Sequence, residues 1–409
     1  MAQMFDDRDI ALKGHYLAQK KIDFVVTGGV ASVESARFIR ELRRYGAEVR
    51  VWMTPSAEKF VSPLVFEWAS KQVVITELSG SAQHISSSDA VVVAPCTLNF
   101  LSKVALGIAD TAAATLIQSA LGRLPLFIAP SMHSSLADVP AYQRQRKSLS
   151  MTPLVHFLEP ESSESKLKMI SVESAVAAVC HALQAQTFSS VPKMVIAFGP
   201  TRSAIDDVRY VSNHSTGALG LQIAEEFFRR GFDVTAIAGP IQLPVPSFLK
   251  TISVKTNSEM KKAMSDVVKR GADIAIFCAA ILDFEVVKTI RGKLSSRSAF
   301  DIALKPSPKL IESINAPKLF KVGFKLEAGV SEKVLLQRAQ EAIQKQKVEL
   351  LVANRLEDVS SSAHRALLLA KGSAAAVRLN SRQEIAQALA VHFESKLKSH
   401  FRRKSSRRA

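Results

Sequence analysis

Short apolar segments alternate with amphipathic ones along most of the chain. Two stretches follow the same order, in which an apolar strand leads through a glycine turn to an amphipathic helix and a further strand. This alternation predicts βαβ units with parallel strands. The predicted elements are strand 22–27, helix 32–45 and strand 48–53 in the first stretch, and strand 194–198, helix 216–230 and strand 233–238 in the second.

Two further segments, 90–93 and 274–277, are apolar without any alternation. Such runs are typical of strands buried on both faces of a parallel sheet. The predicted fold is therefore α/β, with two doubly wound, Rossmann-like domains of three layers each.

The domain boundary is expected near residue 190, where an aperiodic segment ends in proline. Helix 172–183 closes the first domain. A strand at 351–354, a hairpin and helix 382–395 end the second. The predicted domains are residues 1–188 and 189–395, followed by a basic tail, 396–409, that we expect to be disordered.

Composition fits a globular protein of two domains, because 47% of the 409 residues are hydrophobic and 22% are charged. No apolar run is long enough to cross a membrane, and the first residues lack the pattern of a secretory signal. Cys96, Cys180 and Cys278 lie too far apart for a disulfide framework or a metal-ligand spacing. We therefore expect a cytoplasmic protein.

The net charge of +17 is partly local, since seven of the last fifteen residues are Lys or Arg and none is acidic. Such a tail could contact nucleic acid or acidic lipid, but the sequence favours a solvated end without either partner. The remaining positive charge suits ligands that carry phosphate groups.

Small hydroxyl residues follow three predicted strands of the first half, at Thr54, Ser56, Thr97 and Ser131, and a glycine pair follows another at 28–29. Ligands of open α/β sheets bind beyond the carboxyl ends of the strands. These residues could therefore line one pocket for a phosphate and a ring, although ordinary turn chemistry explains them equally well. His84, among serines, could be a surface or a catalytic residue.

Taken together, TGGVAS, TPSAEKF, His84, APCTLNFLSKVALGIAD and APSMH resemble the flavin-containing cysteine decarboxylases over about the first 150 residues. That family includes phosphopantothenoylcysteine decarboxylases, which bind FMN between the protomers of a trimer. The resemblance implies flavin oxidation of a substrate thiol, followed by loss of CO2. It implies His84 as the catalytic histidine and an FMN site made by Gly28, Gly29, Thr54, Ser56, Thr97, Asn99 and Ser131.

Two departures from that family bear on decarboxylation. The family's Pro-Ala-Met-Asn is Pro130-Ser131-Met132-His133 here, so an imidazole replaces the amide that binds substrate. Residues 158–174, where the family has a flap with a proton-donating cysteine, hold no cysteine and no glycine. A decarboxylation-impaired FMN-binding domain and a non-catalytic regulatory flavoprotein are therefore alternatives to full activity.

The second half is similar to the bacterial phosphopantothenate–cysteine ligases over residues 194–354, through FGPTRSAIDDVRYVSNHSTGALG, FCAAILDF, GKL, SPKLI, VGFKLE and ELLVAN. The family activates the carboxylate of 4'-phosphopantothenate with CTP, and L-cysteine then forms the amide. The resemblance implies that Asn213, at a predicted helix start, stabilises the acyl-nucleotide. It implies a CTP site made by Phe277, Cys278, Ala279, Asp283, Lys293, Pro308, Lys309, Leu310, Ile311 and Phe324.

Lys309 stands where that family has an acidic residue, and two usual lysines correspond to Ala342 and Gln346, with Lys345 and Lys347 nearby. The sequence shows no carboxylate cage for a metal, so Mg²⁺ would be held largely by the nucleotide. The two resemblances also imply a homo-oligomer, with trimeric contacts through the flavin domain and dimeric contacts through the ligase domain.

Overall fold

The computed structural model describes residues 6–83, 85–163, 166–296, 299–360, 363–373 and 375–405. The chain forms two compact units, Met1–Leu183 (unit 1) and Gln184–Ala409 (unit 2).

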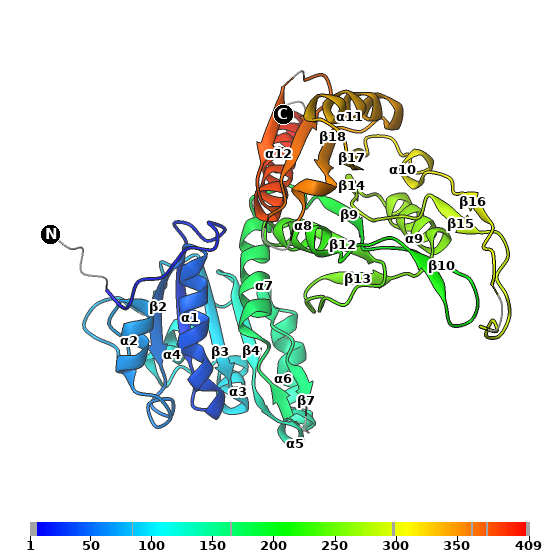
Figure 1. Cartoon of the computed structure of the whole chain (residues 1–409). Helices are drawn as coiled ribbons and strands as arrows, with labels where there is room; N and C mark the ends of the chain where they lie inside the picture. The colour runs from blue at the N-terminus through cyan, green and yellow to red at the C-terminus, as the bar shows by residue number, and fades with distance from the viewer. Residues whose placement is uncertain are drawn as a thin grey trace. The chain divides into compact units, whose positions relative to one another are not determined.

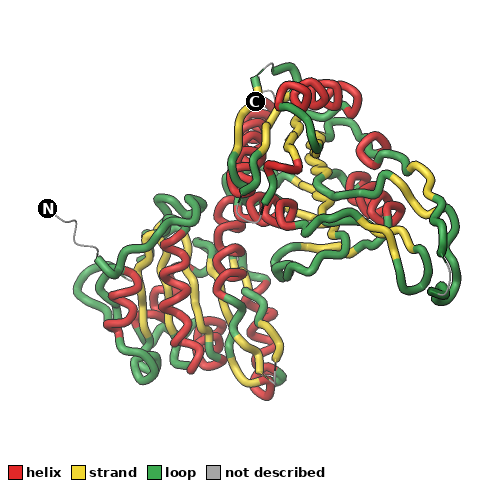
Figure 2. The backbone as a smooth tube through the Cα atoms, in the orientation of Figure 1, coloured by secondary structure: helices red, strands yellow, loops and turns green. Residues whose placement is uncertain are grey.

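Unit 1 is built on a parallel sheet of five strands in the order β2-β1-β3-β4-β6 (Figures 1 and 2). The central strands are buried along nearly their whole length, as their apolar runs predict. The strands are β1 (Lys21–Val26), β2 (Glu48–Met53), β3 (Ala90–Cys96), β4 (Leu126–Pro130) and β6 (Val155–Phe157).

Helices cover both faces of this sheet, because each presents one apolar stripe. Helices α1, α2 and α7 pack on one face, and α3, α4 and α6 pack on the other. The bounds are η1 (Val30–Glu34), α1 (Ser35–Arg44), α2 (Pro63–Ser70), α3 (Leu98–Leu106), α4 (Ala112–Ala120), α5 (Ser134–Ala137), α6 (Pro140–Ser150) and α7 (Val172–Ala185). Cys180 is fully buried in α7, as expected of a core residue.

A small antiparallel sheet in the order β5-β8-β7 completes unit 1. It joins β5 (Met132–His133), β7 (Glu161–Ser163) and β8 (Lys166–Lys168), so the segment at the expected flap position forms a hairpin that pairs with the strand carrying His133.

Unit 2 contains an eight-stranded sheet in the order β13-β12-β9-β14-β17-β18-β19-β20. The first six strands are parallel, and the last two form the antiparallel hairpin predicted beyond residue 354. The strands are β9 (Lys193–Phe198), β12 (Asp233–Ala238), β13 (Lys250–Ser253), β14 (Ile274–Phe277), β17 (Phe320–Glu327), β18 (Leu350–Arg355), β19 (Ala366–Ala370) and β20 (Ala376–Leu379).

Helices α8 and α12 cover one face of this sheet, and α9, α10 and α11 cover the other. Two hairpins stand apart from the sheet: β10 (Arg202–Ala204) with β11 (Tyr210–Ser212), and β15 (Phe284–Val286) with β16 (Leu304–Pro306). The helices are α8 (Ala218–Arg229), α9 (Asn257–Lys269), α10 (Leu310–Ser313), α11 (Glu332–Gln346), η2 (Leu356–Asp358) and α12 (Arg382–Ser405).

The predicted fold class is confirmed, since both units are three-layer α/β structures with doubly wound parallel sheets. Some element bounds differ from the predictions. The expected helix at 32–45 is divided into η1 and α1. Helix α12 continues to Ser405, through residues expected to be a disordered tail, and its buried stripe reaches Leu397. In the part of the chain that the structure describes, no helix is both long and apolar enough to span a membrane.

Candidate functional site

The first candidate site lies at the carboxyl ends of β1, β2 and β3, where the strand order of unit 1 reverses. Ligands of doubly wound sheets bind at such switch points. Thr27, at the end of β1, is buried and joins the first and third strand ends. Its hydroxyl donates to the carbonyl of Pro95 at 2.7 Å and accepts from the backbone N–H of Thr97 at 3.2 Å.

The glycine pair after β1 allows the neighbouring strand ends to approach closely. A Cβ at Gly28 would lie 2.4 Å from Cβ of Ser56, and a Cβ at Gly29 would lie 3.2 Å from Cγ2 of Thr97. Beside them, the hydroxyls of Thr54 and Ser56 are 3.1 Å apart. The structure therefore brings Gly28, Gly29, Thr54, Ser56 and Thr97 together at the ends of β1, β2 and β3.

The remaining residues of the predicted flavin site lie around the start of α3. Thr97 is the N-cap of that helix, and its hydroxyl accepts from the backbone N–H of Phe100 at 3.4 Å. Asn99 is exposed in the first turn, and the N–H of Ser131 donates to the carbonyl of Cys96 at 3.1 Å. His84, the predicted catalytic histidine, lies outside the described residues.

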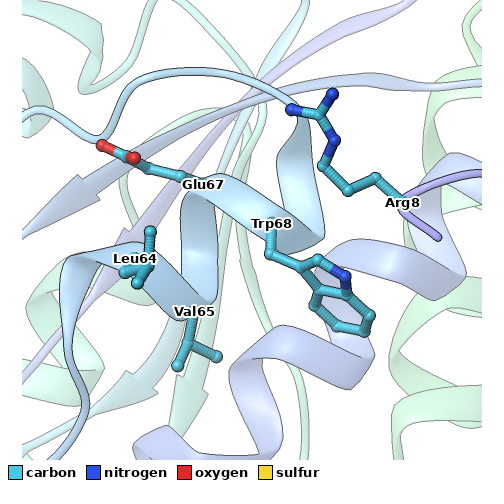
Figure 3. Close-up of a pocket in the computed structure, with 5 residues that line it drawn as sticks. All are labelled: Arg8, Leu64, Val65, Glu67 and Trp68. Carbon is cyan, nitrogen blue, oxygen red and sulfur yellow. The ribbon is translucent and has the colours of Figure 1, made fainter. Parts of the chain in front are cut away.

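His133 is exposed, and its ring is engaged locally. Its Nδ1 accepts from the backbone N–H of Ser135 at 3.2 Å and so caps α5. A pocket of about 490 Å³ in unit 1 lies elsewhere, against α2. Figure 3 shows Trp68 and Arg8 on one side of this pocket and none of the predicted flavin-site residues.

The second candidate site lies at the carboxyl ends of β9 and β14, the switch point of unit 2. The backbone N–H of Ala280 donates to the carbonyl of Gly199 at 2.9 Å, so the two strand ends continue side by side. Phe277 is buried at the end of β14, and Cys278 and Ala279 are half-buried after it. Burial raises the pKa of Cys278 to about 12, so this thiol stays protonated at neutral pH.

Asn213 lies at this switch point, in a loop that precedes α8. Its Nδ2 donates to the carbonyls of Ala280 at 3.2 Å and Ile281 at 3.0 Å. Helix α8 begins only at Ala218, and its N-cap is Gly217 with φ 74°, so Asn213 is not a helix cap. Because both amide hydrogens serve backbone carbonyls here, donation to a reaction intermediate requires Asn213 to release at least one of them.

Lys293 lies in the long loop between β15 and β16, which runs beside β10 (Figure 1). Its side chain is exposed, but two aspartates of the β10–β11 hairpin fix the loop. Asp207 accepts from the N–H of Gly292 at 2.7 Å, and buried Asp206 accepts from the N–H of Leu294 at 3.0 Å. Hydrogen bonds from Leu294, and then from Arg209 and Val208, lower the pKa of Asp206 to about 2.

Asp283 and Lys309 contact each other, with Nζ of Lys309 2.5 Å from Oδ1 of Asp283. Pro308 and Lys309 precede α10. Leu310 and Ile311 are the first two residues of α10, and their side chains are buried in the core between this helix and the sheet. Phe324 packs on the opposite face of the sheet, with the core under α8. The structure thus brings Asp283 to the start of α10 but separates the side chain of Phe324 from those of Leu310 and Ile311.

The residues that hold these loops were not among the predicted site residues. Thr201 Oγ1 donates to Asn257 Oδ1 at 2.6 Å, and Asn257 Nδ2 donates to the carbonyl of Leu282 at 2.8 Å. Thr201, Asp206 and Asp207 all fall within the quoted ligase-like segment, and burial of Thr201 and Asp206 is the signal that distinguishes them. Among the described residues, no cluster of His, Cys, Asp and Glu could hold a metal ion.

Comparisons with known proteins match both units. The family described as "DNA/pantothenate metabolism flavoprotein C-terminal domain" matches residues 190–396, and the family described as "Flavoprotein" matches residues 11–184. A solved structure of the DNA/pantothenate metabolism flavoprotein from Streptococcus pneumoniae is 26% identical and covers 50% of this chain and 100% of that one, with a TM-score of 0.47.

Two curated relatives carry the name "Coenzyme A biosynthesis bifunctional protein CoaBC". The protein from Thermococcus kodakarensis is 34% identical over 398 residues, which cover 95% of this chain and 98% of the relative. The protein from Methanocaldococcus jannaschii is 33% identical over 351 residues, which cover 84% of this chain and 85% of the relative. With both domain families matched in the same order, the chain belongs to the CoaBC family of bifunctional proteins of coenzyme A biosynthesis.

Proposed function

We propose that unit 2 joins 4'-phosphopantothenate to L-cysteine at the expense of CTP, and that unit 1 decarboxylates the product with FMN to give 4'-phosphopantetheine. Membership of the CoaBC family supports this pair of reactions. The observation that carries the ligase is the meeting of the Asn213 loop with the residues that follow β14. The loop that carries Lys293 is bound separately, to the turn of the β10–β11 hairpin.

The proposed ligase reaction has two steps, activation of the carboxylate and formation of the amide. A carboxylate oxygen of 4'-phosphopantothenate attacks the α-phosphorus of CTP, so the acyl-cytidylate forms and pyrophosphate leaves. The amine of cysteine then attacks the acyl carbon, CMP leaves, and the amine loses a proton. Lys293 offsets the negative charge of the phosphates, and Asn213 stabilises the acyl-cytidylate once its amide turns from the β14 loop.

The nucleotide is proposed to lie along the ends of β9 and β14, against Phe277, Cys278 and Ala279. Asp283 would accept from the ribose or base, in exchange for its present contact with Lys309. Lys345 supports the same region, since its Nζ is 3.7 Å from Glu312 of α10. Mg²⁺ would accompany CTP as a complex with the triphosphate.

FMN is proposed for the unit 1 site, because the Gly28–Gly29 turn brings backbone and the hydroxyls of Thr54 and Ser56 together at the ends of β1 and β2. Thr54, Ser56, Thr97, Asn99 and Ser131 would contact the phosphate and ring. When bound, FMN would supply reversible two-electron redox chemistry for oxidation of the substrate thiol, which would permit loss of CO2. The protein's part would be to hold the thiol against the ring. His84, outside the described residues, is proposed as the catalytic histidine from the resemblance alone.

A second candidate is an active ligase joined to an FMN-binding domain that decarboxylates poorly. The hairpin β7–β8, at the expected flap position, favours this reading because no cysteine lies between residues 158 and 174. A non-catalytic flavoprotein is less consistent with the Lys293 loop, because Asp206 and Asp207 bind its backbone on both sides of Lys293. In either active form, we propose a cytoplasmic homo-oligomer with trimeric contacts through unit 1 and dimeric contacts through unit 2.

Mass spectrometry tests the ligase. The protein, incubated with 4'-phosphopantothenate, cysteine, CTP and Mg²⁺, should form phosphopantothenoylcysteine, CMP and pyrophosphate. Asn213→Ala should lower the rate about a hundredfold, the usual cost of removing a donor from a developing charge. Asn380→Ala, in an exposed loop before α12, serves as the matched control. Wild-type turnover by Asn213→Ala would remove Asn213 from the mechanism.

A further inference from the structure

Lys321 is a buried lysine on the strand that runs beneath α10, and among the described residues it forms no ion pair with a carboxylate. It is the second residue of β17, and only 6% of it is exposed. Its Nζ donates to the carbonyl of Ile311 at 3.1 Å and to Oδ1 of Asn315 at 3.1 Å. Burying an ammonium group is unfavourable unless its hydrogens are satisfied, so these two contacts define its place in the fold.

The contacts of Lys321 belong to a wider cap on α10. A helix of four residues leaves its carbonyls without intrahelical partners. Here side chains supply three successive donors. The Ser313 hydroxyl donates to the carbonyl of Leu310 at 2.8 Å, Lys321 donates to that of Ile311, and Asn315 Nδ2 donates to that of Glu312 at 2.9 Å. Because Lys321 also donates to Oδ1 of Asn315, its ammonium group is one of the three donors and orients a second.

The same face of β17 fixes the position of α10 against the sheet. A Cβ at Gly323 would lie 3.4 Å from Cδ1 of Ile311, so the isoleucine side chain rests on the bare strand two residues after Lys321. Burial lowers the pKa of Lys321, and Lys347 lowers it further against an opposing effect of Glu312. The segment before α10 is held at its other end, where the N–H of Ser307 donates to the carbonyl of Asp283 at 2.8 Å and Lys309 contacts the Asp283 carboxylate. The α10 cap is the second anchor of this segment.

We propose that Lys321 is a positioning residue for nucleotide binding, which sets the segment Pro308–Ile311 by capping α10 from below. The inference rests on the proposed CTP-dependent function of unit 2. No contact between Lys321 and the nucleotide is proposed, because the Lys321 side chain is buried and its hydrogen bonds go to Ile311 and Asn315. Its effect is therefore on CTP affinity more than on the chemical step.

Lys321→Met in the full chain removes the charge and keeps the length of the side chain. The KM for CTP should rise at least about tenfold, as expected when hydrogen bonds from a charged donor are lost, while kcat changes less than about twofold. Lys321→Arg, which can still donate to both acceptors, should recover most of the affinity. Val322→Ala, buried on the opposite face of β17, is the control for general destabilisation.

Hydrogen exchange supplies a readout that needs no nucleotide. Amides of residues 310–315 should exchange faster in Lys321→Met than in Val322→Ala. If Lys321→Met does not fold, Asn315→Ala removes the exposed end of the same cap and should show both effects in weaker form. A wild-type protein that binds no CTP would refute the proposed ligase. Normal CTP affinity in a variant with a loosened α10, or unchanged exchange in Lys321→Met, would overturn the role of Lys321 alone.

Discussion

At the scale of single residues, Asp206 shows how a buried carboxylate can support a site that it does not enter. It accepts from three backbone N–H groups and from Arg209, and together these contacts tie the β10–β11 hairpin to the Lys293 loop. The described residues of the loop between β15 and β16 are mostly exposed, so these hydrogen bonds are important for holding its conformation. Lys321 has the corresponding role beneath α10.

The lowered pKa of Asp206 predicts a defined pH dependence. Its pKa falls from an ordinary 3.8 to about 2 on folding. A carboxylate with a lower pKa in the folded state stabilises the protein above the unfolded pKa, and that contribution disappears as the pH falls through the folded pKa. Asp206→Asn should therefore lower the free energy of unfolding at pH 7, and the difference from wild type should shrink between about pH 4 and pH 2.

Urea unfolding at a series of pH values measures that difference. Asp301→Asn, at an exposed position between β15 and β16, provides the comparison and should leave the profile unchanged. A constant difference between Asp206→Asn and wild type across the acidic range would show that packing, rather than the charge of Asp206, accounts for the loss.

At the scale of elements, strands were the most predictable part of the chain. Short, continuously apolar runs such as 90–93 and 274–277 are typical of strands buried on both faces of a sheet, and both are interior strands of their sheets. Helix starts were less predictable, because Gly217 in the left-handed region delays α8 and a 3-10 turn replaces the start of α1. Lys321 could not be identified, since its acceptors lie on another element and a lysine in a strand suggests exposure.

The N-cap of α3, at the proposed flavin site, provides a test at the scale of elements. Thr97 caps α3 and Thr111 caps α4, each through its side-chain oxygen. Replacing either by Ala should cost about 1 kcal/mol of stability. Only Thr97→Ala should also reduce FMN content, because Thr111 is not among the proposed flavin contacts. Thr97→Ser should restore both properties.

Flavin released by acid from equal amounts of each purified variant, together with thermal unfolding, separates these effects. Equal flavin loss in Thr97→Ala and Thr111→Ala would indicate that stability alone governs retention. A wild-type protein without flavin, which does not quench added FMN, would contradict the flavin site as a whole.

At the scale of the whole molecule, the family joins two reactions in one chain, so the relative rates of the two halves decide which product accumulates. Unit 1 retains the glycine turn and hydroxyls of the proposed flavin site. The β7–β8 hairpin pairs with β5, with Lys166 opposite His133 in the backbone register. This segment, at the position expected for the flap, holds no cysteine, the residue that the resemblance implies as the proton donor.

We expect ligation to outpace formation of 4'-phosphopantetheine. A placed general acid contributes about a hundred- to ten-thousand-fold, so CO2 should be released with little 4'-phosphopantetheine formed. A time course of both products by mass spectrometry, with CO2 measured in parallel, tests this. His133→Asn, which restores the amide of the related decarboxylases, should strengthen substrate binding without supplying the proton. Equal rates of the two products would refute the prediction. If His133→Ala then still released CO2 but no longer formed 4'-phosphopantetheine, His133 would be identified as the proton donor.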